Sequence, residues 1–134
     1  MIAESWLSQN WILWLVVGLH LAWGFIALFD PEMGMTQSTI AQLQRMLGLP
    51  LWAVGLVFIG AAAISLWGLL APHRRADMRV LLLLPQQMVM VFILAGLIDH
   101  LFTPSPARPN YIGLVNSGLI TAFHTAGIFS HARR

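Results

Sequence analysis

Four long apolar stretches alternate with short polar segments along the chain. They cover about residues 9–29, 51–71, 80–98 and 111–129. Each has about 19–21 residues, and an α-helix of that length spans the roughly 30 Å of hydrocarbon in a bilayer. Because lipid offers the backbone no hydrogen-bonding partner, each stretch is predicted to be helical. Barrel strands would be shorter and would alternate apolar with polar residues. The sequence therefore predicts an all-α membrane protein with one four-span transmembrane domain over residues 1–134.

The first connection is predicted to contain a shorter helix. Residues 30–34 (DPEMG) form a helix-stop and turn cluster. Over residues 36–47, apolar positions recur at i, i+3 and i+7 with polar residues between them, which is typical of a short amphipathic helix. Gly48 and Pro50 are expected to end it. Such a helix is expected to lie in the outer interface of the membrane.

The composition supports a membrane protein and excludes several other classes. Hydrophobic residues make up 58% of the chain and charged residues 9%, whereas soluble domains have about 45–50% and about 25%. Cysteine is absent, which excludes disulfides, thiol nucleophiles and thiolate metal sites. All seven basic residues are arginines, and they lie between or after the apolar stretches. We therefore expect no nucleic-acid binding, and the lipid bilayer is the expected environment.

Arginine placement predicts the orientation of the chain. Five arginines lie on one side of a four-span chain: Arg74, Arg75, Arg79, Arg133 and Arg134. The connections on the other side hold only Arg45 and Arg108. Because cytoplasmic segments carry the excess of arginine, both termini are predicted to be cytoplasmic, in a protein integral to the cytoplasmic (inner) membrane.

Small residues are candidates for the surfaces on which the helices pack. Lipid is as apolar as leucine, so helices associate in a membrane where small side chains let them approach closely. The fourth stretch carries small residues at i+4 steps, and the first two stretches offer others. The candidate helix-packing residues are Gly18, Ala22, Gly60, Gly113, Ser117, Thr121 and Thr125. Along these faces the four helices are expected to form a compact bundle.

The third stretch contains a proline, Pro85. Proline lacks a backbone donor and its ring clashes with the preceding turn, so a kink is predicted at this point. Neighbouring polar groups would then bind the carbonyl that the proline frees.

Polar side chains from all four stretches fall at a similar depth when counted from the cytoplasmic ends. This intramembrane polar layer is expected to contain Trp14, Ser65, Gln86, Gln87, Thr121 and His124. An unpaired amide in hydrocarbon costs on the order of a few kcal/mol. The layer is interpreted either as hydrogen bonding that fixes the register of the helices or as a polar path or ligand site. Adjacent residues differ by about 100° around a helix, so one of the two glutamines is expected to face a second contact, such as another copy of the chain.

His20 and His124 are candidate ligands of a b-type haem; no other cofactor or metal is indicated. A haem between two helices needs both ligands at similar depth. His124 is expected to lie about five residues further inward than His20, a mismatch of roughly 7 Å. Otherwise each histidine would be a neutral, hydrogen-bonded side chain. Catalysis is not predicted, because Ser117 and His124 are about 10 Å apart along one helix, too far for a nucleophile and its base.

At the level of residues, Pro85–Gln86–Gln87 and Phe123–His124–Thr125 carry a resemblance to a known class. The chain resembles small phage-encoded membrane proteins of the holin type, over its whole length in size and number of spans. The resemblance implies accumulation in the host cytoplasmic membrane, lateral self-association into a homo-oligomer, and a lesion that releases a lytic enzyme. Two other classes stay open. One is a haem- or quinone-associated anchor subunit of a redox complex, and the other is a structural or assembly subunit of a larger membrane complex.

Overall fold

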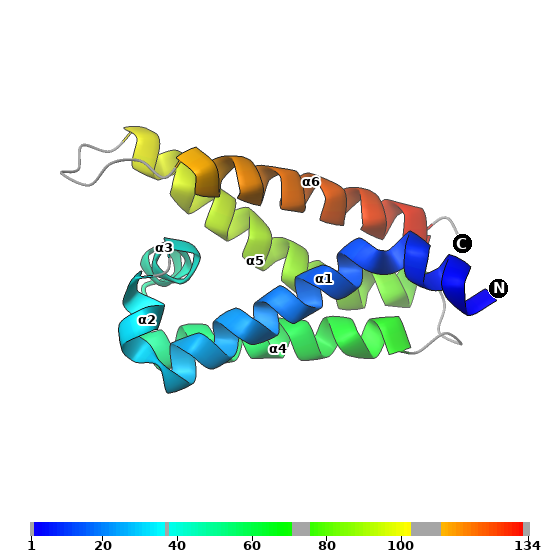
Figure 1. Ribbon diagram of the computed structural model, residues 1–134, viewed down its shortest axis with the longest axis horizontal. Helices are drawn as coiled ribbons and strands as arrows, with labels where there is room; N and C mark the ends of the chain where they lie inside the picture. The colour runs from blue at the N-terminus through cyan, green and yellow to red at the C-terminus, as the bar shows by residue number, and fades with distance from the viewer. Residues whose placement is uncertain (1, 37, 71–75, 103–110, 133–134) are drawn as a thin grey trace.

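The computed structural model describes residues 2–36, 38–70, 76–102 and 111–132, and nearly all of them are helical (Figure 1). Within these ranges, four helices are long and apolar enough to cross a membrane. They are α1 (Ile2–Phe29), α4 (Leu51–Leu70), α5 (Ala76–Phe102) and α6 (Tyr111–Ala132). Two short helices, α2 (Pro31–Thr36) and α3 (Ser38–Leu47), connect α1 to α4. The predicted all-α architecture with four spans is confirmed, and the protein is a membrane protein.

The third span is longer than predicted. The apolar stretch at residues 80–98 is the centre of α5, which runs from Ala76 to Phe102. At its start, Oδ1 of Asp77 accepts a hydrogen bond of 2.9 Å from the backbone nitrogen of Met78. At its end the helix continues through Asp99 and His100. Charged residues end an apolar run but not a helix, because their side chains can reach water from helical positions.

The predicted turn after the first span is instead the start of a helix. Asp30 precedes Pro31, and Oδ1 of Asp30 accepts a hydrogen bond of 3.2 Å from the backbone nitrogen of Met33. An aspartate cap followed by proline at the first helical position is a start signal as well as a stop signal. The amphipathic helix that follows is present as α3. It ends at Gly48, which has a φ of 65°, as expected for a glycine just after a helix.

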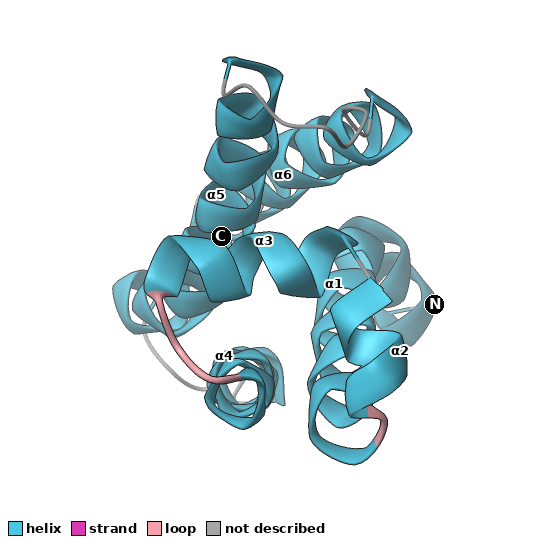
Figure 2. Ribbon diagram, turned by 90° about the vertical axis from the view of Figure 1, so that its left-hand side faces the viewer, coloured by secondary structure: helices cyan, strands magenta, loops and turns pink. Residues whose placement is uncertain are grey.

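Helix α3 packs against the long helices, and its predicted position in the membrane interface stays a prediction. Figure 2 shows α3 crossing the bundle between the α5–α6 pair and the α1–α4 pair. Ile40 and Leu43 are fully buried in a cluster with Phe58 and Ile93. Nη2 of Arg45 donates a hydrogen bond of 2.8 Å to the carbonyl oxygen of Gly96 on α5. The apolar face of α3 is therefore covered by protein, and α3 separates the two helix pairs at the end of the bundle away from the termini.

Glycines allow close helix contacts, but at positions other than those predicted. A Cβ atom added to Gly24 of α1 would lie 3.0 Å from the carbonyl oxygen of Gly55 of α4 and 2.5 Å from Cγ1 of Ile59. Gly127 of α6 also lies close to α1, where a Cβ would be 2.9 Å from Cγ2 of Ile12 and 3.2 Å from Cδ2 of Leu13. Small residues allow helices to approach this closely, and at Gly24 a larger side chain would meet a backbone atom of α4.

The prediction that Gly18, Ala22 and Gly60 form packing faces within the bundle is wrong. Gly18 and Ala22 lie on the exposed side of α1, and a Cβ added to Gly18 or Gly60 would meet nothing within 4 Å. Helix α1 is apolar on all sides, so its hydrophobic pattern cannot identify the face that turns inward. The ridge predicted on α6 does lie on the inward side, with Thr121 buried and Gly113, Ser117 and Thr125 half-buried.

Candidate functional site

The core of the bundle contains polar side chains from all four long helices. The fully or nearly fully buried ones, among the residues described, are His20, Ser65, Gln86, Thr121 and His124. Trp14 and Gln87, the other members of the predicted polar layer, are half-buried. Hydrogen bonds divide the predicted layer into two junctions, one between α4 and α5 and one between α5 and α6. His20 on α1 is a buried polar residue outside the predicted layer.

A chain of hydrogen bonds joins α5 to α6. Oγ1 of Thr125 donates its single proton to the carbonyl oxygen of Thr121, at 2.8 Å. Oγ1 of Thr125 must therefore accept from Nε2 of Gln87, at 2.7 Å. This fixes the amide orientation, so that Oε1 of Gln87 faces Nδ1 of His124, at 2.6 Å. Because an amide oxygen only accepts hydrogen bonds, Nδ1 of His124 carries the proton, and Nε2 of the neutral ring is an unprotonated acceptor.

His20 on α1 is held in the same protonation pattern by a different partner. Its Nδ1 lies 2.9 Å from the carbonyl oxygen of Val16, one turn earlier on the same helix. A carbonyl oxygen can only accept, so Nδ1 of His20 is the donor and Nε2 is unprotonated. Aromatic rings of Trp23 and Phe58 pack against the imidazole, with ring centroids 5.6 Å and 5.4 Å away. Aromatic side chains therefore cover part of the His20 ring.

The difference in depth between His20 and His124 also depends on the direction in which their side chains lean. Helices α1 and α6 run in opposite directions (Figure 1). Helical side chains lean toward the N-terminus of their own helix, so His20 and His124 lean toward each other in depth. This lean reduces the mismatch of about 7 Å expected from the helical rise alone.

Gln86 and Gln87 both turn into the bundle, contrary to the expectation that one faces outward. Gln87 is occupied by His124 and Thr125. Gln86 is 0% exposed, and neither its Oε1 nor its Nε2 has a hydrogen-bond partner among the residues described. Both side chains can face the bundle because they lie about 100° apart around α5, so that Gln87 faces α6 and Gln86 a different part of the core. Neither glutamine is available to another copy of the chain.

Ser65 provides the junction between α4 and α5 near the proline. Helix α5 continues without interruption through Pro85. Oγ of Ser65 donates a hydrogen bond of 3.3 Å to the carbonyl oxygen of Leu82, in the turn preceding the proline. Proline cannot donate to the carbonyl four residues earlier, so this turn has fewer internal bonds than its neighbours. Ser65 therefore links α4 to the turn before the proline, but the carbonyl that Pro85 leaves without a backbone donor is that of Leu81, so a polar partner for the freed carbonyl and the kink both stay predictions.

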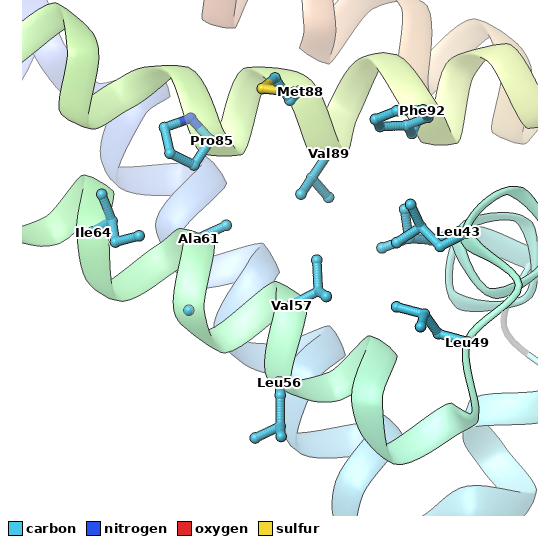
Figure 3. A pocket seen from close by; sticks show the side chains of 12 residues that line it. Leu43, Leu49, Leu56, Val57, Ala61, Ile64, Pro85, Met88, Val89 and Phe92 are labelled. Atoms are coloured by element: carbon cyan, nitrogen blue, oxygen red, sulfur yellow. The ribbon is translucent and has the colours of Figure 1, made fainter.

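An apolar pocket of about 470 Å³ lies between α3, α4 and α5 (Figure 3). Side chains from these helices, including Leu43, Val57, Pro85 and Val89, point into it. Its lining consists only of apolar residue types and glycine. It can take up an acyl chain, but it has no side-chain donor for the carbonyl of a quinone.

Comparisons with known protein families, with curated proteins and with solved structures found no match to this chain. The site is therefore defined by its own geometry. Sequence reasoning missed the role of Thr125 in the hydrogen-bond chain and the close approach of Gly24 to Gly55. Glycine and threonine are common in membrane helices. The local sequence pattern does not show which residue of another helix they contact, so these contacts could not be predicted.

Proposed function

We propose that the protein is an integral protein of the cytoplasmic membrane that self-associates laterally through the exposed face of α6. The observation that carries the proposal is Asn116, an amide inside the fourth span that is exposed on the outer side of that helix. Asn116 shares a recess of about 270 Å³ with Tyr111, Ile112 and Val115. In the membrane this face meets lipid or another protein.

The exposed amide favours a protein neighbour over lipid. Leaving it unpaired in hydrocarbon costs on the order of a few kcal/mol, whereas a hydrogen bond between spanning helices contributes roughly 0.6–2 kcal/mol. An amide both donates and accepts, so two copies of α6 can pair their Asn116 side chains reciprocally about a twofold axis. Ala122 and Ala126, one turn apart on the exposed side of α6, are small enough to allow close approach.

Helix α6 is also the least covered of the four spans. Only 22% of its apolar window is buried, against 39%, 44% and 39% for the others. Leu119 and Phe123 are more than half exposed on the same helix. Lipid tails can cover such a face, but only a second protein can cover it and also satisfy the amide.

The orientation we propose has both termini in the cytoplasm. The start of α1, the end of α4, the start of α5 and the end of α6 lie at one end of the bundle (Figure 1). The sequence puts the five arginines of the positive-inside argument at that end. Arg79 is within α5; Arg74, Arg75, Arg133 and Arg134 lie outside the described residues.

The activity we propose is the one that the holin resemblance implies, permeabilisation of the cytoplasmic membrane by the assembled protein. Self-association is the physical requirement, because one four-helix bundle with an apolar exterior and a packed core provides no aqueous path. A structural subunit of a larger complex is the competing outcome, in which the exposed face of α6 would bind a different chain.

A cysteine crosslinking experiment tests the interface directly. The chain has no cysteine, so Leu119→Cys introduces a single thiol on the proposed face, and Ile64→Cys introduces one on the exposed side of α4 as a matched control. We expect disulfide-linked dimers in membranes for Leu119→Cys and not for Ile64→Cys. Adding Asn116→Leu should reduce the dimer severalfold, whereas Asn116→Gln should retain it.

Induction of the wild-type chain should admit a membrane-impermeant dye, and Asn116→Leu should delay its entry. High expression without dye entry would contradict permeabilisation. Equal crosslinking at Leu119→Cys and Ile64→Cys would contradict the α6 interface. Stoichiometric recovery of a different membrane chain with the wild type, lost in Asn116→Leu, would favour the structural-subunit alternative.

A further inference from the structure

We propose that the apolar pocket between α3, α4 and α5 binds an acyl chain of a bilayer phospholipid, from the leaflet at the end of the bundle that contains α3. The pocket has a volume of about 470 Å³, and the described residues that line it are apolar types and glycine (Figure 3). Water occupies a cavity only where polar groups can bind it, and an empty space forfeits the dispersion contacts of its lining. Hydrocarbon is therefore the content that this pocket takes up in a membrane.

The pocket is accessible from the side, through the hydrocarbon of the bilayer. Part of its lining is buried, including Leu43, Ala61 and Val89. Leu56 of α4 and Met88 of α5 also line it, and both are more than half exposed. Because both residues lie within membrane spans, their exposed sides meet lipid. A lipid chain can enter directly from the bilayer, whereas a water-soluble ligand would first have to cross lipid.

Contacts within the chain close the pocket at both of its ends. At one end, Leu43 and Leu47 of α3 form part of the lining (Figure 3). Beyond the other end α4 and α5 meet closely, since a Cβ added to Gly68 would lie 2.8 Å from Cβ of Leu82. A spanning helix of a second copy would need a groove along the full depth of the bundle, which these two contacts interrupt. An acyl chain needs only the depth of one leaflet.

The length of the pocket is comparable to the depth of one leaflet. On α4 the lining extends from Leu56 to Ile64, about 12 Å at the helical rise. Half of a hydrocarbon core of roughly 30 Å is about 15 Å. Leu49, which also lines the pocket, directly precedes α4, so the pocket begins near the start of that span and extends to the middle of the bundle. A chain in this position contacts α3 and both spans, and thereby helps to hold α3 in place.

Gly60 provides a substitution that fills the pocket without a clash. It is part of the lining, and a Cβ added to it would meet nothing within 4 Å. Gly60→Phe therefore places an apolar ring where the acyl chain would lie. Gly18→Phe is the matched control, because a Cβ at Gly18 also meets nothing within 4 Å, but Gly18 lies on the exposed side of α1 and does not line the pocket.

Native mass spectrometry of the chain, extracted from bacterial membranes in mild detergent, is the first arm of the test. We expect the wild type to retain a single phospholipid per chain after free lipid is removed. Gly18→Phe should retain it equally, whereas Gly60→Phe should lose it severalfold. Gly60→Leu fills less of the pocket and should give an intermediate loss, which keeps the test valid where the larger ring prevents folding.

Thermal unfolding with added phosphatidylglycerol is the second arm. A ligand that binds only the folded chain stabilises it, so the lipid should raise the unfolding temperature of the wild type and of Gly18→Phe. Gly60→Phe should lose most of this rise while its circular dichroism spectrum stays that of the wild type. A misfolded variant would instead lose the spectrum.

Three outcomes overturn the proposal. The first is equal retention of phospholipid by the wild type, Gly60→Leu and Gly60→Phe. The second is retention of a free fatty acid in place of a phospholipid. The third is a lipid-free wild-type dimer that Gly60→Phe abolishes, which would assign the pocket to a second copy. The described lining includes no residue of α6, so these outcomes leave the interface at Asn116 untouched.

Discussion

Nδ1 of His124 lies 2.6 Å from Oε1 of Gln87, and this contact joins α6 to α5 in the core of the bundle. A third residue, Thr125, determines which of the two side chains donates this hydrogen bond. Thr125 directs its proton to the carbonyl of Thr121, which orients the amide of Gln87 and in turn places the proton of His124 on Nδ1. Side chains within a single turn of α6, acting through one glutamine, thereby decide which nitrogen of the histidine is left to bind something else.

The two adjacent glutamines should respond in opposite ways to the same substitution. Gln87→Leu leaves Nδ1 of His124 buried without a partner, so we expect a loss of about 1–3 kcal/mol in the free energy of unfolding. Gln86→Leu replaces an amide whose polar atoms have no partner with an apolar side chain of similar size. We expect it to be neutral or stabilising, because no hydrogen bond is lost. Reversible unfolding in mixed micelles measures both.

A large loss of stability in Gln86→Leu, with little change in Gln87→Leu, would contradict the assigned hydrogen bonds. The double variant should resemble Gln87→Leu alone, because the two amides share no partner on the α6 side.

Glycine positions provide a second matched pair. Gly24→Ala places a Cβ 2.5 Å from Cγ1 of Ile59 and 3.0 Å from the carbonyl oxygen of Gly55. We expect it to destabilise the bundle by about 1–3 kcal/mol, because the backbone atom cannot move aside as a side chain can. Gly18→Ala meets nothing within 4 Å and should stabilise the helix by roughly 0.5–1 kcal/mol. Thermal unfolding of both variants in one detergent would show the difference, and equal effects would refute the packing described.

Length and hydropathy were sufficient to predict the four spans, because a bilayer imposes both on any helix that crosses it. The amphipathic helix α3 was predictable for a related reason: Ile40 and Leu43 repeat with helical period and Gly48 ends it. The packing faces were not predictable. Helices α1 and α4 are apolar all round, so Gly18 and Gly24 are equivalent by local pattern and only tertiary contact distinguishes them.

The polar site was predictable in part. Gln86, Gln87 and His124 stand out because amides and imidazoles are rare in hydrocarbon. The sequence does not show which partners these residues have. A rotation of α5 by one residue would place Gln86 instead of Gln87 opposite α6. The relation of His20 to His124 also depends on the lean of side chains in antiparallel helices, which a count of residues along each span omits.

Helix α3 should loosen when its link to α5 is removed. Arg45 donates to the carbonyl oxygen of Gly96 and its Nη1 lies 3.3 Å from Oδ2 of Asp99. These two side chains are 41% and 55% exposed, so we expect Arg45→Ala to reduce the protection of α3 amides from hydrogen exchange by about 1 kcal/mol or less. Asp99→Asn retains the bond to Gly96 and should have a smaller effect that high salt removes. Unchanged exchange in Arg45→Ala would show that apolar burial alone holds α3.

Topology can be measured with single cysteines at exposed positions. Glu32→Cys lies on α2 at one end of the bundle, and Asp77→Cys lies near the start of α5 at the other. Because the arginine-rich end is expected in the cytoplasm, an impermeant thiol reagent should label Glu32→Cys in cells whose cytoplasmic membrane is intact. Asp77→Cys should be labelled only after that membrane is opened. The reverse pattern would invert the proposed orientation.

The hydrogen bonds of both buried histidines place the proton on Nδ1 and leave Nε2 unprotonated. Nitrogen-15 NMR of the chain in a lipid bilayer, with assigned histidine side chains, measures this directly. We expect Nδ1 to be the protonated nitrogen of His20 and of His124, and Gln87→Leu to change the signals of His124 alone. Protonation at Nε2 of either histidine in the wild type would contradict it.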